Sequence, residues 1–205
     1  MAIHNENPFE REICEHLAAN GWLYSSNDEG YDRERALFPA DVFAWLEQTQ
    51  PEAFARATAP AQGREQLLDR LVKSLDAPFE ASGGQQGGTL AVLRRGFESV
   101  PHKFRMAQFK PADALNENTN SDYAAMRVRV MRQVHYSTKN QKSIDLVLFV
   151  NGLPVATIEL KTDFTQSVEH AKTQYRHDRD PKGEPLLGFG RRALVHFAVS
   201  NREVW

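Results

Sequence analysis

The spacing of hydrophobic positions predicts helices through most of the first hundred residues. Apolar residues recur every three or four positions in four segments, which is the period of a helix with one buried face. Gly21 marks the end of the first helix, and Pro51 interrupts or restarts the second. The predicted helices are residues 8–20, 40–56, 63–75 and 89–97.

A change of period predicts strands in the second half of the chain. Short hydrophobic runs and alternating patterns replace the helical spacing there. Residues 116–120 contain three Asn and predict a loop, whereas residues 167–179 predict a helix that Asp180-Pro181 stops. The fold class that follows is α/β, with a mixed central β-sheet flanked by helices. The predicted strands are residues 103–109, 126–134, 144–150, 155–161 and 193–200, with another beginning at 203–205.

Residues 143–161 form the most informative stretch, a predicted β-hairpin that carries charges within a hydrophobic pattern. The Asn151-Gly152 pair marks the reversal. Because strand side chains alternate between faces, Asp145 lies on one face of the first strand, and Glu159 and Lys161 share one face of the second. The two acids converge if the register sets them opposite each other. The simplest such register has a three-residue loop, residues 151–153, with Val150 opposite Pro154.

Two carboxylates at close range repel unless a cation lies between them, and Mg²⁺ is the usual partner of such oxygen ligands. The Lys161 ammonium could stabilise the developing charge of a phosphate or orient an attacking water. This is the chemistry of phosphodiester hydrolysis. A Glu-x-Lys triplet alone carries little weight, because a chain with 16 Glu and 8 Lys contains about 0.6 of them by chance. The alternative is an edge hairpin with exposed charges.

A wider match to a known family supports the catalytic interpretation. Residues 132–181, including Ile-Asp-Leu-Val-Leu-Phe-Val-Asn-Gly-Leu-Pro, resemble the N-terminal nuclease domain of the type I restriction enzyme R subunit, within the PD-(D/E)xK nucleases. Residues 188–205 continue the resemblance. The resemblance implies a restriction endonuclease-like core, residues 101–205. The helical spacing makes residues 23–100 a largely helical accessory region, and the Gly-rich composition of residues 82–88 predicts a flexible loop, all within one nuclease domain, residues 1–205.

The resemblance also implies residue roles. Asp145 and Glu159 would bind Mg²⁺, the backbone carbonyl of Leu160 would be a further metal ligand, and Lys161 would be the catalytic lysine. The family has a Gln-x-x-x-Tyr element on the following helix, and Gln174 occupies the position of its glutamine.

This chain departs from that element, because Asp178 occupies the tyrosine position and Tyr175 directly follows the glutamine. A role for Tyr175 and its packing in the helix both stay open. Related nucleases often place a glutamate on the first helix near the metal. Glu10 resembles that residue, because its spacing from Ile13 and Leu17 turns it toward the fold, although an acid in a first turn also favours the helix dipole.

The resemblance sets expectations for the rest of the enzyme. A full R subunit is a longer chain whose motor translocates double-stranded DNA using ATP and assembles with modification and specificity subunits. No motor motif is present in these residues, so we expect an N-terminal fragment of a longer motor subunit that holds the cutting chemistry and binds no ATP itself.

Composition narrows the class of protein. A length of 205 residues with 41% hydrophobic content supports one sizeable core. The single cysteine, Cys14, excludes an intrachain disulfide and a cysteine-rich zinc site, and we expect it to be buried. No signal peptide or long apolar run is present, which points to the cytoplasm and away from a membrane.

Charge is distributed unevenly along the chain. The first hundred residues carry 9 Lys and Arg against 16 Asp and Glu, and the remainder carry 16 against 11. The basic half, which holds the candidate site, would attract a polyanion such as DNA, although any single residue there could be a solvated surface charge. The seven histidines show no metal-ligand spacing, but His170 and His177 could reach a phosphate. The basic residues flanking the site are Arg127, Arg129, Arg132, Lys139, Lys142, Lys172, Arg176, Arg179, Arg191 and Arg192.

Two other functions stay open at this point. One is a non-catalytic DNA-binding or coupling module that keeps the nuclease fold, and it gains if the two acids lie too far apart to share a metal. The other is a PD-(D/E)xK nuclease from a different system, such as a repair or resolving enzyme.

Overall fold

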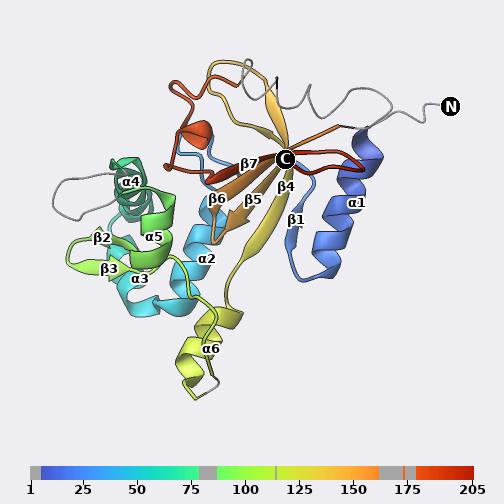
Figure 1. Ribbon diagram of the computed structural model, residues 1–205. Coiled ribbons are helices and arrows are strands. Elements are labelled where there is room, and N and C mark those ends of the chain that lie inside the picture. Colours follow the sequence, from blue (N-terminus) through green and yellow to red (C-terminus); the bar gives the residue numbers. More distant parts are fainter. Residues whose placement is uncertain (1–5, 79–86, 114, 162–172, 174–178) are drawn as a thin grey trace.

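A computed structural model describes residues 6–78, 87–113, 115–161, 173 and 179–205. Helices dominate the first half and strands the second, as the hydrophobic periodicity predicts (Figure 1). The helices are α1 Glu6–Ala19, α2 Pro39–Thr49, α3 Pro51–Thr58, α4 Gly63–Asp76, α5 Thr89–Arg95 and α6 Glu117–Ala124, with a 3₁₀ turn at Pro185–Leu187; the strands are β1 Leu23–Ser25, β2 Phe97–Ser99, β3 His102–Phe104, β4 Val128–His135, β5 Ser143–Val150, β6 Leu153–Leu160 and β7 Val195–Val199.

A five-stranded mixed sheet in the order β1-β4-β5-β6-β7 forms the centre. The two inner pairs are antiparallel, and the two outer strands, β1 and β7, are parallel to their neighbours. Helices flank the sheet, so the fold is α/β with a mixed sheet, consistent with a restriction endonuclease-like core (Figure 1). β1 lies within the region predicted to be accessory, because residues 23–25 complete the edge of the sheet.

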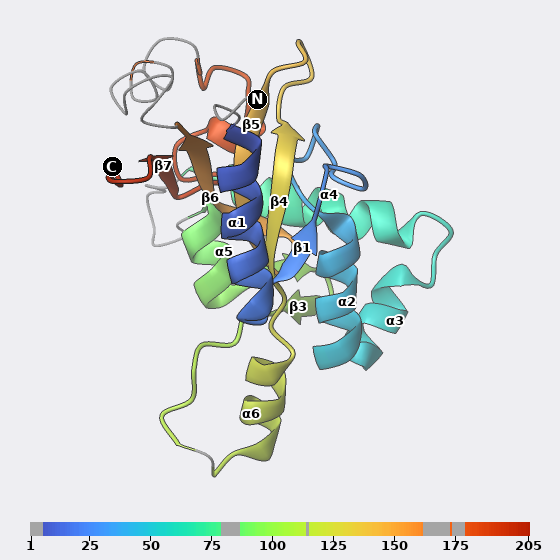
Figure 2. The ribbon, with the colours of Figure 1, turned by 90° about the vertical axis from the view of Figure 1, so that its right-hand side faces the viewer.

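The two faces of the sheet are covered by different elements. α1 lies across one face, which Figure 2 views from the outside, and Cys14 is fully buried there against Leu146 and Leu160. On the opposite face, Val147 and Phe149 belong to a second core cluster. Alternating residues of β5 therefore enter two separate cores, which explains why this strand is hydrophobic along almost its whole length.

A third core joins the helices α2 to α5. Trp45, Leu67 and Leu71 are among its fully or almost fully buried members. The predicted second helix is divided at Pro51 into α2 and α3, because proline cannot donate to the preceding turn. The predicted helix over residues 89–97 ends earlier than expected, at Arg95. Gly96 there has φ +76°, and Phe97 starts β2.

Asp41 ties this helical core to the sheet. Its carboxylate is 1% exposed and accepts hydrogen bonds from the guanidinium groups of Arg127, at 2.8 Å, and Arg129, at 2.6 and 3.0 Å. Arg129 also lies over the ring of Phe38. Because breaking a buried ion pair leaves a charge without its partner, this cluster holds α2 firmly against β4.

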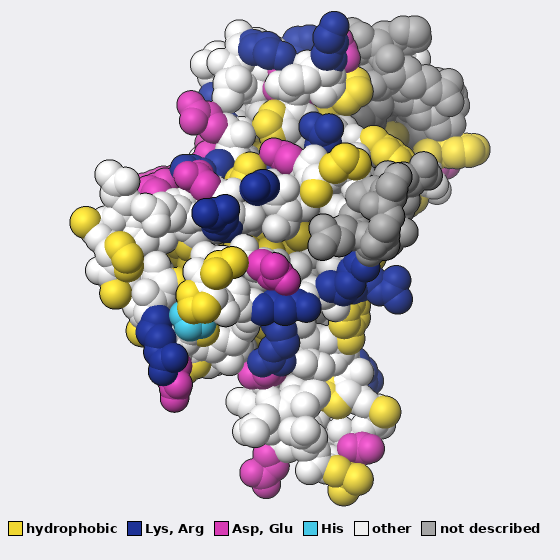
Figure 3. All heavy atoms as spheres, turned by 90° about the vertical axis from the view of Figure 1, so that its left-hand side faces the viewer, with side chains coloured by type: hydrophobic (Ala, Val, Ile, Leu, Met, Phe, Trp, Pro, Cys, Tyr) yellow, Lys and Arg dark blue, Asp and Glu magenta, His cyan; other side chains and the backbone are white. Residues whose placement is uncertain are grey.

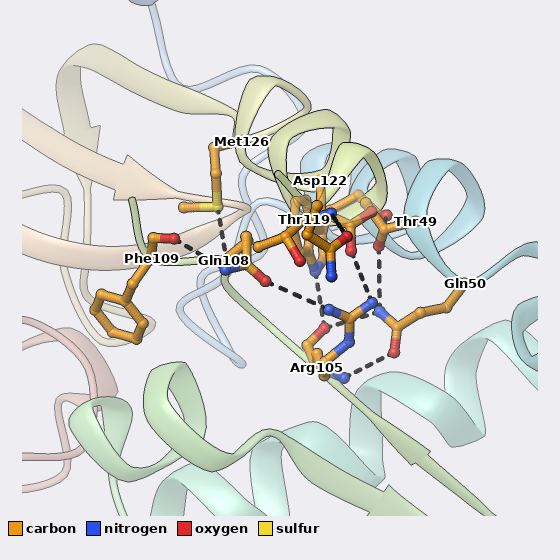
Figure 4. A network of polar contacts seen from close by, with 10 residues as sticks. Thr49, Gln50, Arg105, Gln108, Phe109, Thr119, Asp122 and Met126 are labelled. Atoms are coloured by element: carbon orange, nitrogen blue, oxygen red, sulfur yellow. Dashed lines mark hydrogen bonds and ion pairs between the residues drawn. The ribbon is translucent and has the colours of Figure 1, made fainter. Parts of the chain in front are cut away.

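Residues 116–120 form the start of helix α6, and the loop predicted there is wrong. Asn116 caps the helix, since its side-chain oxygen accepts from the backbone N–H of Thr119 at 3.1 Å. α6 projects from the body of the molecule (Figures 1 and 2), and none of its residues is buried. An ion pair of 2.8 Å between Arg105 and Asp122 anchors it, within the network shown in Figure 4.

The strand predicted over residues 103–109 is mostly absent. Only β3, His102–Phe104, is formed, and it pairs with β2 in a separate two-stranded sheet. The next backbone groups bond to side chains instead of a neighbouring strand. The carbonyl of Arg105 accepts from Trp45 Nε1 at 2.8 Å and from Gln50 Nε2 at 3.0 Å. Side chains thus provide hydrogen-bond partners for backbone groups in the segment that the hydrophobic pattern predicted as a strand.

Candidate functional site

The β5–β6 hairpin brings the two acids opposite each other, but by a different route from the one predicted. Val150 pairs with Leu153, so the turn contains two residues, Asn151 and Gly152, with φ +48° and +80°. The predicted three-residue loop with Val150 opposite Pro154 is therefore wrong. Two successive residues with positive φ are what a tight hairpin turn of this length requires, and Asn-Gly is the preferred pair for it.

A β-bulge restores the alignment of the acids. Phe149 pairs with Pro154, whereas Leu148 pairs with Ala156, so Val155 is the extra residue. Beyond the bulge the pairing continues to Leu146 opposite Ile158, which sets Asp145 opposite Glu159 at the next position. Both carboxylates thus come from neighbouring positions on adjacent strands.

Asp145 is partly buried, and each of its oxygens accepts a hydrogen bond. Oδ2 accepts from the backbone N–H of Leu160 at 2.7 Å, and Oδ1 accepts from Nε2 of Gln133 at 3.2 Å. These bonds fix the carboxylate in orientation. They occupy two of its roughly four lone-pair positions, so both oxygens can still bind a cation.

Glu159 is almost completely buried, with 2% of its surface exposed. Burial, and then the negative charge of Asp145, raise the pKa of Glu159 to about 8, although Arg179 opposes the shift. Nη2 of Arg179 donates to Oε1 of Glu159 at 2.5 Å and to the carbonyl of Ser143 at 2.7 Å. The register of β5 and β6, continued by one position past Leu146 and Ile158, sets the two carboxylates on facing positions, as the metal hypothesis requires.

Lys161 follows directly after β6 and is 9% exposed. Its backbone N–H donates to the carbonyl of Val199 at 2.9 Å, which continues the pairing of β6 with β7 past the last assigned residue. Since β6 alternates, Lys161 belongs to the same face of the strand as Glu159. The role of its ammonium beside the pair of acids stays a prediction.

Glu10 enters the site from α1. It is 4% exposed, as its spacing from Ile13 predicts, and its two oxygens accept from Arg132 Nη2 at 3.0 Å and Gln133 Nε2 at 3.2 Å. Glu10 thus connects to Asp145 through the Gln133 amide. Its role as a metal ligand stays a prediction.

Two further residues of the site, Gln133 and Arg179, did not stand out in the sequence. Gln133 bridges Glu10 and Asp145, and Arg179 pairs with Glu159 while its guanidinium lies over the ring of Tyr136. The only available signal for Arg179 was its place among the basic residues near the site. Gln133 gave no signal, because a glutamine in a strand is common and its contacts are distant in sequence.

Seven residues named from the sequence lie outside the described residues: His170, Lys172, Gln174, Tyr175, Arg176, His177 and Asp178. Their proposed contacts with DNA or the active site therefore stay predictions. Most of the helix predicted over residues 167–179 and of the loop predicted over residues 82–88 lies outside them as well.

The donor set suits a hard divalent cation such as Mg²⁺. Asp145 and Glu159 offer carboxylate oxygens, and burial together with the negative charge of Asp145 raises the pKa of Glu159. Among the described residues, no group of three or more Asp, Glu, His or Cys side chains could enclose a metal ion. A cation here would therefore rely on two carboxylates, the Leu160 carbonyl and water, which is the sparse protein coordination typical of Mg²⁺.

Several of the basic residues near the site form ion pairs with acidic residues of the protein itself. Arg129 and Arg132 are engaged by Asp41 and Glu10, and Arg192, 1% exposed, pairs with Asp76 at 3.0 Å. These arginines therefore have acidic partners within the protein itself. On the face that carries α5 and the β2–β3 hairpin, Lys and Arg are interspersed with acidic and hydrophobic side chains (Figure 3). The exposed cations named above that remain in the described residues are Lys139, Lys142 and Arg191.

Comparison with known protein families gives a match. A family model described as the type I restriction enzyme R protein N terminus matches residues 4–205. No curated protein and no solved structure gives a significant match. In the part of the chain that the structure describes, no helix is long and apolar enough to cross a membrane.

Proposed function

The chain belongs to the family of type I restriction enzyme R protein N termini, and from this premise we propose that it is the Mg²⁺-dependent endonuclease domain of such a subunit. Its substrate is double-stranded DNA, and its reaction is hydrolysis of a phosphodiester bond. The observation that carries the proposal is the placement of Asp145 opposite Glu159, with Lys161 following on the same face of β6.

Each residue of the site has a distinct part in this reaction. Asp145 and Glu159, with the Leu160 carbonyl, would hold the cation, which would act as a Lewis acid and make the attacking water more acidic. Lys161 stabilises the negative charge that develops on the phosphate and orients the attacking water. The hydrogen bonds from Leu160 N–H and Gln133 keep the Asp145 carboxylate in place before substrate arrives.

The rest of the enzyme supplies what this domain lacks. We propose that cleavage follows ATP-driven translocation by a motor region of the full subunit, assembled with modification and specificity subunits. Selection of the DNA site would belong to those partners. ATP would bind the motor region, and this domain would bind the DNA backbone and Mg²⁺.

The test uses the full-length subunit with its partners. Lys161→Ala and Glu159→Ala should abolish DNA cleavage while ATP hydrolysis and translocation continue, because the cutting site and the motor are separate. An exposed lysine that is not among the basic residues flanking the site, Lys110→Ala, provides the matched control. Normal cleavage by either site variant would overturn the proposal and favour a non-catalytic DNA-binding or coupling module.

A further inference from the structure

Gln133 has an unusual backbone conformation in the middle of a strand. It lies within β4, Val128–His135, yet its φ is +47°. A left-handed conformation costs a residue with a side chain on the order of 1 to 3 kcal/mol, and such residues cluster at functional sites. Pairing between β4 and β5 is regular at Arg132 with Leu146 and at Val134 with Ile144, but it omits the intervening position, where Gln133 faces Asp145.

The side chain of Gln133 uses all of its polar atoms. Nε2 lies 3.2 Å from Oε1 of Glu10 and 3.2 Å from Oδ1 of Asp145, so the two amide hydrogens can serve one carboxylate each. Oε1 accepts from the hydroxyl of Ser143 at 2.9 Å, which fixes which end of the amide faces the acids. One neutral side chain thus links α1, β4 and β5.

The left-handed turn of the backbone explains how one strand residue reaches both acids. Arg132, the residue before Gln133, points to the α1 side of the sheet and binds Glu10. Asp145 lies on the opposite face of the sheet, which it shares with Val147 and Phe149. A residue in ordinary extended conformation would serve only one of these faces. The interruption at Gln133 lets its amide lie between them.

We propose that Gln133 is a positioning residue that orients the Asp145 carboxylate for the divalent cation and couples it to Glu10. The inference rests on the proposed function, because it assigns Asp145 to the metal. A neutral amide suits this task, since it donates to carboxylates without adding a positive charge that would compete with the cation. Hydrogen-bond partners of metal ligands typically change metal affinity by about 10- to 100-fold when they are removed.

The experiment measures Mn²⁺ binding to the purified chain by isothermal titration calorimetry, with thermal unfolding of each variant recorded without metal. Gln133→Gly removes the amide and also removes the backbone cost of a positive φ. Relief of the backbone offsets part of the stability lost with the three hydrogen bonds, so its thermal stability should fall only slightly, and its Mn²⁺ affinity should fall about 10-fold or more. Gln133→Asn keeps an amide and tolerates positive φ, but it is one methylene too short to bridge the acids, and the same loss of affinity is expected.

Ala36→Gly is the matched control. Ala36 also has a positive φ, of +50°, and it is not a contact of the site acids, so relief of its backbone should leave Mn²⁺ affinity unchanged. If Gln133→Gly and Gln133→Asn both bind Mn²⁺ like the wild type, the positioning role is overturned.

A further variant separates that result from a failure of the proposed function. Asp145→Asn should abolish Mn²⁺ binding. If it binds Mn²⁺ normally, the metal site itself is wrongly assigned and the nuclease proposal fails with it. If it loses binding while the Gln133 variants retain it, only the positioning role fails.

Discussion

Replacing Glu159 by glutamine should change how the stability of the metal-free protein depends on pH. Burial and the charge of Asp145 raise the pKa of this carboxyl from an ordinary 4.5 to about 8 in the folded protein. In the unfolded chain both influences vanish. Between these two values the folded state therefore binds a proton that the unfolded state has released, so stability falls as pH rises through this window.

The size of the effect follows from the linkage relation. One proton difference changes the free energy of unfolding by about 1.4 kcal/mol per pH unit. From about pH 6 to about pH 8 the unfolded carboxyl is ionised, while the folded one goes from almost fully to about half protonated, so Glu159 alone should cost about 2 kcal/mol of stability. Glutamine has nearly the same shape, can still accept from Arg179, and does not titrate. The variant should therefore lack this component of the pH dependence.

Urea unfolding with a chelator present, at about pH 6, 7 and 8, measures the difference between wild type and Glu159→Gln. Taking the difference between the two free energies of unfolding removes the contribution of every group that titrates in both proteins. Glu12→Gln, at an exposed position on α1, controls for the removal of an acid. Adding Mg²⁺ should restore the stability of the wild type at about pH 8 and leave the variant unaffected, because a ligand stabilises only the state that binds it. Parallel stability curves for wild type and Glu159→Gln across this range would refute the account of the site.

Three further substitutions or reactions test other parts of the structure. Gly152→Ala should lower the free energy of unfolding by about 2 to 4 kcal/mol in urea titrations, because φ is +80° and the new Cβ would lie 2.5 Å from the Phe38 carbonyl oxygen; a loss below about 1 kcal/mol would contradict the described turn. Asp41→Asn should cost about 3 kcal/mol by the same measurement, since two arginines lose their buried partner, and a neutral result would show that the cluster is not what holds α2 to β4. Cys14, fully buried and with its pKa raised to about 11 by burial, should react with thiol reagents only as the protein unfolds; rapid labelling of the native protein would place it at the surface.

The sequence predicted the β5–β6 part of the main sheet, where the alternation of hydrophobic residues agrees with the observed strand pairing. Alternation in β5 and β6 and the Asn-Gly turn are properties of short stretches, and the requirement that Asp145 face Glu159 selected the correct register near the acids. The bulge at Val155 could not be predicted. Valine suits any strand position, so nothing in the sequence shows which residue the pairing leaves out.

Helix α6 shows the limit of hydrophobic periodicity. Its residues bury nothing, so the pattern that identifies helices is absent, and the polar run was assigned to a loop. The local signal was nevertheless present, since Asn116 is a favoured capping residue and Glu117 places an acid in the first turn. A prediction weighted toward caps would have found this helix.

The partners of the acids depend on contacts between distant parts of the chain. Arg179 meets Glu159 across 20 residues of sequence, and Glu10 meets Gln133 across 123. The hairpin pattern supplied the two acids and the lysine, and the family resemblance assigned their roles. It did not indicate the arginine or the left-handed glutamine, because their roles follow from the particular packing of this chain.

The bulge in β6 also has a consequence for related sequences. Val155 is an insertion between the turn and the acids, so a chain one residue shorter in this segment could lose the bulge and still set the same two carboxylates face to face. The number of residues separating the acids can thus vary by one while the site keeps its shape. Searches for such sites that demand a fixed interval would miss members of the same kind, and searches that follow strand pairing would recover them.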